Sequence, residues 1–170
     1  FDDFSANFEG ANAALAALGK DPISEASYLE TFDFPILHFY KRNGINVDDY
    51  LEELSYANNA FFPVYEKLAL SCPARDGAKE LLAWLQERPV KILILSNHIE
   101  ESIRSNLQRL DLLPHIDHIS GNPHDNDIIR KMNKQERLNR FMKDHGFTAD
   151  RAFIIGDSLE EPDIAKNLGL

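Results

Sequence analysis

The segment VKILILS, residues 90–96, decides the fold, because it lies between two stretches whose apolar residues recur at helical spacing. These flanking stretches are RDGAKELLAWLQER (75–88) and IEESIRSNLQRLDLL (99–113). A short, continuous run of branched apolar residues is typical of a strand that is buried on both faces of a parallel sheet. The succession of helix, strand and helix therefore predicts an α/β fold.

The C-terminal third repeats this alternation. The predicted strands are HIDHIS (115–120) and RAFIIGD (151–157), and the predicted helices that follow them are KQERLNRFMKDHG (134–146) and PDIAKNLG (162–169). Strands that alternate with helices favour a doubly wound, Rossmann-like parallel sheet. Because three strands make a thin sheet, we expect further strands, including one directly before Phe1.

The first 70 residues carry only helical signals. NFEGANAALAALG (7–19) places its apolar residues on one helical face and ends at Gly19. Ser24 is the predicted N-cap of a short helix. VDDYLEELSYANNAFFPVYEKLAL (47–70) also has helical spacing, with an interruption expected near Pro63. An all-helical unit therefore precedes the α/β part.

The bulk composition predicts a soluble, cytoplasmic protein. A chain of 170 residues, 44% of them hydrophobic, can form one domain, or a core with a small insertion. Its net charge of -10 argues against nucleic acid or an anionic membrane as a partner. Cys72 is the single cysteine, so an internal disulfide is excluded and a reducing compartment is expected. No apolar run approaches the ~20 residues of a membrane helix. The sequence does not determine the oligomeric state.

Polar residues follow two of the predicted strands at the point where each strand ends. Ser96 and Asn97 come after ILIL, and Gly156, Asp157 and Ser158 come after AFII. Doubly wound sheets bind ligands outside the carboxyl ends of their strands, and the amides of the following helices favour anions. A carboxylate repels a phosphate unless a cation lies between them, and Mg²⁺ is the usual cation. The sequence thus indicates a magnesium and phosphate site.

A phosphate site also favours a positive side chain, and the residues alone leave its choice open. Lys131 and Lys134 both lie between the two strands. The second acid beyond Asp157 is equally open, because Glu160, Glu161 and Asp163 all follow it. His98, next to Asn97, is expected to be a solvated loop histidine.

Three segments of the sequence resemble the second, third and fourth motifs of the haloacid dehalogenase superfamily, in its phosphatase branch. They are ILILSN (92–97), KQERLNRFMKDHGF (134–147) and FIIGDSLEEPDIAKNLGL (153–170). The resemblance extends continuously over residues 74–170. The helical first third is similar to the cap of phosphoglycolate-phosphatase-like members. The resemblance implies the end of the first-motif region over residues 1–4, a helical cap over 5–72 and a Rossmann-like core over 73–170, whose C-terminal part is missing.

The resemblance also implies a role for each candidate residue. Ser96 and the amide of Asn97 would hydrogen-bond the transferring phosphoryl group. Lys134, rather than Lys131, would stabilise the same group and the nucleophile. Asp157 would bind Mg²⁺, with Glu161 as the second acid of the metal site.

The nucleophile is the part of the family pattern that the sequence does not match. The family uses an aspartate in an Asp-x-Asp motif, which is followed by Thr or Val. With Asp2 as the nucleophile the second acid would be Phe4, and with Asp3 it would be Ser5. Three explanations stay open. The motif lies upstream of Phe1 in a longer protein, an internal gap follows Asp2 and makes Asp2 the nucleophile, or the motif has degenerated.

The resemblance implies a magnesium-dependent phosphatase that hydrolyses a small phosphorylated metabolite through an aspartyl-phosphate. This exact chain is expected to be inactive unless upstream residues exist. Three alternatives stay open. They are a haloacid dehalogenase that needs no metal, a phosphoglucomutase-like transferase, and a non-catalytic protein that binds a phosphorylated ligand or a protein partner.

Overall fold

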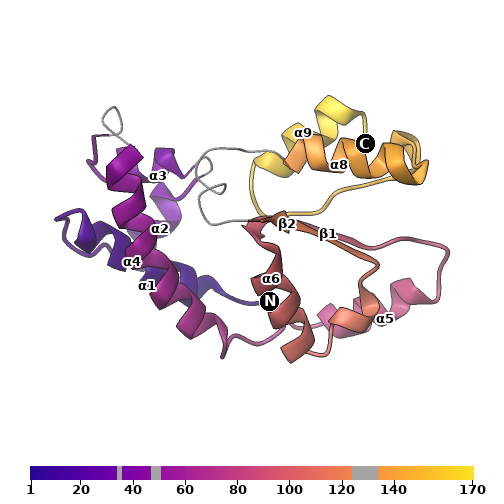
Figure 1. Ribbon diagram of the computed structural model, residues 1–170, viewed down its shortest axis with the longest axis horizontal. Coiled ribbons are helices and arrows are strands. Elements are labelled where there is room, and N and C mark those ends of the chain that lie inside the picture. The colour runs from indigo at the N-terminus through magenta and orange to yellow at the C-terminus, as the bar shows by residue number, and fades with distance from the viewer. Residues whose placement is uncertain (34–35, 47–50, 124–133) are drawn as a thin grey trace.

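The computed structural model describes residues 1–33, 36–46, 51–123 and 134–170. A helical part made from the N-terminal third lies beside an α/β part made from the rest of the chain (Figure 1). In the part of the chain that is described, no helix is long and apolar enough to cross a membrane.

The helical part contains the three helices that the sequence predicts, which are α1 (Phe4–Ala17), α2 (Glu25–Thr31) and α4 (Leu51–Ala69). It also contains a short helix without a separate sequence prediction, α3 (Leu37–Arg42). Gly19 ends α1 with a positive φ of 72°, which a residue without a side chain adopts at little cost. The predicted N-cap is confirmed, because the Ser24 hydroxyl accepts a hydrogen bond from the Ser27 amide at 3.2 Å.

The predicted interruption at Pro63 is wrong, because α4 runs through this residue to Ala69. A proline inside a helix removes one backbone hydrogen bond and costs about 3 kcal/mol. Tertiary packing offsets this cost. Ala57 packs into the main apolar cluster of the helical part, and Tyr65 and Ala69 pack into a second cluster with Ala6 of α1. The buried residues on both sides of Pro63 therefore hold the helix together.

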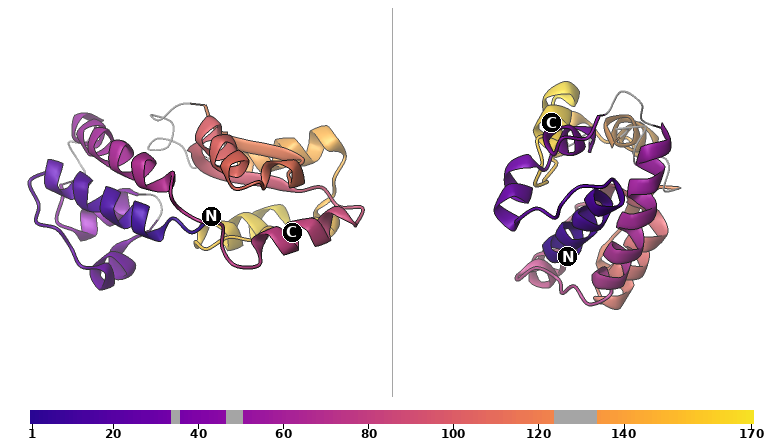
Figure 2. Two further views of the ribbon diagram at one scale, coloured as in Figure 1. Left: turned by 90° about the horizontal axis from the view of Figure 1, so that it is seen from below. Right: turned by 90° about the vertical axis from the view of Figure 1, so that its left-hand side faces the viewer.

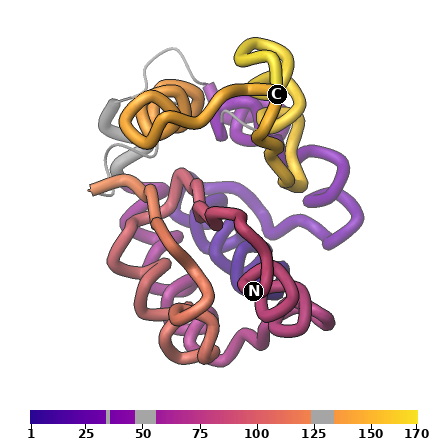
Figure 3. Tube along the Cα trace, turned by 90° about the vertical axis from the view of Figure 1, so that its right-hand side faces the viewer, coloured from indigo at the N-terminus to yellow at the C-terminus, as the bar shows by residue number. Residues whose placement is uncertain are grey.

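The α/β part begins with α5 (Ala78–Gln86), β1 (Leu93–Ile99) and α6 (Glu100–Arg109). A 3₁₀ turn (Leu113–His115), β2 (His118–Asn122), α8 (Lys134–His145), a second 3₁₀ turn (Ala149–Arg151) and α9 (Glu160–Leu168) follow. The two strands pair in parallel, with Leu93 opposite His118, and their register shifts between Leu95 and Ile99. Helices α5 and α6 lie on one side of the strands, where Ile94 packs, and α8 and α9 lie on the other, where Leu93 and Leu95 pack (Figures 2 and 3). The predicted α/β class, with its parallel sheet and helical cap, is confirmed.

The predicted third strand, residues 151–157, does not form in the described structure, whose sheet has two strands. The backbone is extended at Ala152, and the side chains of Ala152 and Ile154 pack with Leu93 in one apolar cluster. A strand also needs a hydrogen-bonded neighbour, and no described strand pairs with this segment. Phe153 and Ile155 are consequently 75% and 80% exposed.

Hydrogen bonds at two places fix the junction between the helical part and the α/β part. The Asp2 amide donates to the carbonyl oxygen of Pro73 at 2.8 Å, so the N-terminal residues lie beside the connection that follows α4. Arg109, at the end of α6, donates to the carbonyl oxygens of Ala69 at 3.0 Å and Cys72 at 2.7 Å. Arg109 therefore fixes the connection after α4 to the α/β part.

Candidate active site

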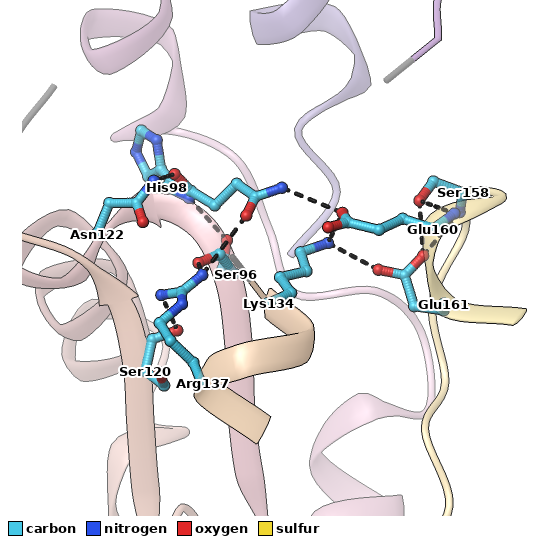
Figure 4. Close-up of polar contacts among 10 residues, drawn as sticks. Ser96, His98, Ser120, Asn122, Lys134, Arg137, Ser158, Glu160 and Glu161 are labelled. Atoms are coloured by element: carbon cyan, nitrogen blue, oxygen red, sulfur yellow. Dashed lines mark hydrogen bonds and ion pairs between the residues drawn. The ribbon is translucent and has the colours of Figure 1, made fainter. Parts of the chain in front are cut away.

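A buried lysine and two buried glutamates form the centre of the candidate site (Figure 4). Lys134 begins α8, and its Nζ lies 2.9 Å from Oε2 of Glu160 and 2.7 Å from Oε1 of Glu161, at the start of α9. Burial alone would lower the pKa of Lys134, but its hydrogen bonds to Glu161 and Glu160 outweigh burial and raise that pKa. Lys134 is therefore held in its charged form.

Asn97 links this cluster to the end of β1. Its Nδ2 donates to Oε2 of Glu160 at 3.1 Å, and both side chains are buried. The carboxyl end of β1, the beginning of α8 and the beginning of α9 thus meet at one point, as the sequence predicts for a strand-end site.

Glu161 has donors at both carboxylate oxygens. Oε1 accepts from Lys134, and Oε2 accepts from the Ser158 hydroxyl at 2.6 Å and the Ser158 amide at 3.3 Å. Burial would raise the pKa of Glu161, but these contacts lower it overall. A Cβ at Gly156 would overlap Cγ and Cδ of Glu161, so a glycine lets the backbone pass this side chain.

Ser96 lies at the point where β1 leaves the ladder. Its hydroxyl accepts a hydrogen bond from the His98 amide at 3.1 Å and its side chain is half-buried. Its carbonyl oxygen accepts from NH2 of Arg137 at 2.6 Å. Ser96 therefore precedes Asn97 at the end of β1, and its backbone is bound directly by Arg137 of α8.

Asp157 lies at the end of the third predicted strand and is exposed. No group of three His, Cys, Asp or Glu side chains among the described residues converges as a metal site. An exposed carboxylate at this position fits Mg²⁺, which keeps several waters and binds few protein ligands. Glu161 fits less directly, because donors already occupy both of its oxygens.

Asp2 does not join the cluster in the described structure. Its carboxylate lies 3.4 Å from Arg75, and its amide bonds to Pro73 at the crossing between the two parts. Lys131, the alternative cation, lies outside the described residues. Lys134 is thus the predicted lysine that the structure brings to Asn97 and the two glutamates.

Three residues near the site were missed or misjudged from sequence. Arg137 binds the ends of both strands from α8. Glu66 of α4 lies 3.2 Å from the His98 ring, so His98 is not the solvated loop residue that the sequence predicts. The signal that could have found Arg137 is its spacing of three from Lys134, which puts both residues on one face of α8.

The fold and the strand-end cluster define an α/β protein of the doubly wound class with a helical cap, and comparison with known proteins identifies the family. The sequence model of haloacid dehalogenase-like hydrolases matches residues 1–170. The chain therefore belongs to the haloacid dehalogenase-like hydrolase family. No curated protein sequence matches the chain significantly.

Solved structures share this fold at low sequence identity. The chain is similar to a predicted phosphatase from Clostridium acetobutylicum, with a TM-score of 0.79 and 15% identity over 99% of this chain and 76% of that one. It is also similar to a haloacid dehalogenase-like family protein from Streptococcus pneumoniae, with a TM-score of 0.76, 14% identity and the same coverage. A predicted phosphoglycolate phosphatase from Haemophilus somnus gives a TM-score of 0.73 at 14% identity, again over 99% and 76%.

Proposed function

We propose that this protein is a magnesium-dependent phosphatase that hydrolyses a small phosphate monoester. The observation that carries the proposal is the charged, buried Lys134, which joins α8 to α9 beside Asn97 at the end of β1. A fixed positive charge of this kind stabilises the charge that develops on a phosphoryl group during transfer.

Each candidate residue has a role in the proposed reaction. The Ser96 hydroxyl and the Asn97 amide bind oxygens of the phosphoryl group, and Lys134 neutralises its charge. Asp157 binds the magnesium ion, and Glu161 supports the metal site while it orients Lys134 and Ser158. The magnesium ion, when bound, screens the phosphate from the carboxylates and polarises the phosphoryl oxygens.

We further propose that an aspartate outside the described residues is the nucleophile. It attacks phosphorus and forms an aspartyl-phosphate, the alcohol leaves with a proton from a second aspartate, and water then releases phosphate. The support is a place for the strand that would carry both groups. Among the described residues, β1 pairs with β2 alone, and the segment at Phe153 and Ile155 pairs with no strand and exposes apolar side chains.

The domain boundaries belong to the same proposal. We assign residues 1–4 to the end of the first-motif region, 5–72 to the cap and 73–170 to the core. The cap contacts the core at His98, one residue beyond Asn97, so it lies where it can cover a small substrate. A small phosphorylated metabolite in the cytoplasm is the substrate that this arrangement favours.

One experiment tests the metal-dependent reaction directly. The coding sequence upstream of Phe1 is read first, because an Asp-x-Asp-x-Thr or Val motif there defines the protein to express. Hydrolysis of p-nitrophenyl phosphate is then measured with Mg²⁺, with EDTA, and with Mg²⁺ restored. We expect turnover that EDTA abolishes and Mg²⁺ restores.

Other outcomes select the alternatives. Release of halide from 2-chloropropionate that resists EDTA would identify a dehalogenase instead. Phosphoryl transfer between sugar phosphates without net phosphate release would identify a mutase. Phosphate binding without turnover, in a protein whose upstream sequence has no Asp-x-Asp motif, would identify a non-catalytic member.

A further inference from the structure

The ladder between β1 and β2 opens next to the candidate site. The strands pair regularly from Leu93 to Leu95, and pairing resumes only at Ile99 opposite Asn122. The residues between are Ser96, Asn97 and His98. Carbonyl groups in such an interrupted stretch lose their regular ladder partners, and buried carbonyl groups need others.

Arg137 supplies two of these partners. Its NH1 donates to the Ser120 carbonyl oxygen at 3.0 Å and its NH2 donates to the Ser96 carbonyl oxygen at 2.6 Å (Figure 4). The guanidinium therefore spans the ends of both strands. A planar fork of fixed donors suits two acceptors at once, which a single ammonium group does less well.

Asn122 supplies a third partner from the end of β2. Its side chain is fully buried, and its Nδ2 donates to the Asn97 carbonyl oxygen at 2.6 Å. Two consecutive carbonyl groups of β1 are thus bound by side chains from α8 and β2. These contacts fix the backbone from Ser96 to His98, where the His98 amide donates to the Ser96 hydroxyl.

The same helix carries Lys134 one turn before Arg137, on the same face. Arg137 therefore sets the distance between the backbone of Ser96 and the ammonium group of Lys134. Burial lowers the pKa of Arg137, although the charges of Glu160 and Glu100 act against this effect. The side chain stays a cation, because the guanidinium group of arginine is not deprotonated in proteins.

We propose that Arg137 is a positioning residue that shapes the phosphate-binding backbone at Ser96 and Asn97 and holds Lys134 in register with it. This inference rests on the proposed function, because the phosphoryl group is the ligand whose binding site it would shape. Arg137 does not contact the substrate in this proposal. It acts through the carbonyl oxygens of Ser96 and Ser120.

The test compares Arg137→Ala and Arg137→Lys with Arg140→Ala, which removes an exposed arginine one turn further along α8. Three quantities are measured in the full-length protein. They are the amide NMR shifts of Ser96, Asn97 and His98, the affinity for inorganic phosphate, and the kcat and KM for p-nitrophenyl phosphate. Each assay of Arg137→Ala is repeated with millimolar guanidinium chloride.

We expect Arg137→Ala to shift these three amides and to bind phosphate about tenfold more weakly, as the loss of a charge-assisted contact predicts. Guanidinium should restore binding in this variant, and Arg137→Lys should retain part of it. Arg140→Ala should match the unchanged protein. Unshifted amides, or shifted amides with unchanged phosphate affinity, would overturn the proposal.

The outcome for Arg137 is separate from the outcome for the proposed function. A full-length protein that binds phosphate without hydrolysing phosphate monoesters refutes the phosphatase. In that case the amide shifts and the phosphate affinity still decide whether Arg137 shapes the site. Rescue by guanidinium distinguishes positioning from general destabilisation, because a denaturing ion does not restore a protein that is merely less stable.

Discussion

At the scale of single residues, one ammonium group in the site balances the negative charge of two buried carboxylates. Glu160 and Glu161 are adjacent and both buried, and Lys134 contacts both of them. A buried ion pair contributes little compared with an apolar replacement, but removing one partner leaves an uncompensated charge and is strongly destabilising. Lys134 therefore supports the fold as well as the proposed chemistry.

Lys134→Met tests this dependence. The substitution keeps an unbranched side chain but leaves both glutamates without a counter-charge, so we expect the free energy of unfolding at pH 7 to fall by about 3–5 kcal/mol. Urea denaturation measures it, with Lys143→Met in the exposed last turn of α8 as the control. A loss no larger than that of the control would contradict the assignment.

The sign of the pH dependence follows from Glu161. Its pKa is lowered below the ordinary 4.5 in the folded protein, so its contribution is complete above pH 4.5 and is lost as the pH falls through the folded value. The stability difference between the unchanged protein and Lys134→Met should therefore shrink below pH 4.5. A difference that stayed constant to pH 3 would show that the charges do not cause it.

At the scale of elements, α4 of the cap meets the end of β1 at a small polar junction. Oε1 of Glu66 accepts from the Ser102 hydroxyl at 2.9 Å and lies 3.2 Å from Nε2 of His98. The rings of Phe62 and Tyr65 also pack against His98. His98 directly follows Asn97, so the junction holds α4 beside the candidate site.

Glu66→Gln tests the junction. The hydrogen bond to His98 lowers the pKa of Glu66, with burial acting against it and Ser102 assisting, so the carboxylate stabilises the fold above its ordinary pKa of 4.5. We expect the substitution to reduce the free energy of unfolding by about 0.5–1 kcal/mol at pH 7, because solvent screens this half-exposed pair. The effect should disappear as the pH falls through the lowered pKa. Glu9→Gln on the exposed face of α1 is the control, and equal losses in both variants would exclude the junction.

The sequence predicted most elements because their signals are local. Ser24 caps its own helix, and Ile103 and Leu107 repeat at helical spacing and are buried in α6. The predicted interruption at Pro63 failed because distant packing outweighs a local cost. The predicted strand at 151–157 failed because a ladder needs a partner, and a segment does not encode its partner locally.

The candidate site was predictable only in part for the same reason. Family resemblance and strand-end logic selected Lys134 and Asn97, and the structure places them together. The contact of Lys134 with Glu160 as well as Glu161 depends on how α9 begins, which spacing does not specify. The spacing of three from Lys134 puts Arg137 on the same face of α8, but it does not reveal the acceptors of Arg137, which are backbone carbonyl groups on two strands.

At the scale of the whole molecule, the α/β part has two helical layers with an incompletely paired sheet between them (Figures 2 and 3). Phe153 and Ile155 expose most of their surface on the extended segment, and no residue of α5 is buried. Exposed apolar side chains beside unpaired backbone favour strand addition or aggregation. The proposed nucleophile strand would cover this region and complete the sheet.

A double substitution of Phe153 and Ile155 by serine tests that arrangement, because its effect should depend on whether the covering strand is present. In the 170-residue chain both side chains are exposed, so the free energy of unfolding should change by no more than about 0.5 kcal/mol and self-association should decrease.

In a longer protein that carries the proposed nucleophile strand, this strand would bury both side chains. The same substitution should then cost several kcal/mol, as large-to-small changes in cores do, with about 3–5 kcal/mol typical for a phenylalanine. Leu29→Ser, on the exposed face of α2, should be neutral in both forms. Equal stability of the doubly substituted and unchanged proteins in the longer form, measured by urea denaturation, would show that no strand covers this segment and that the nucleophile must lie elsewhere.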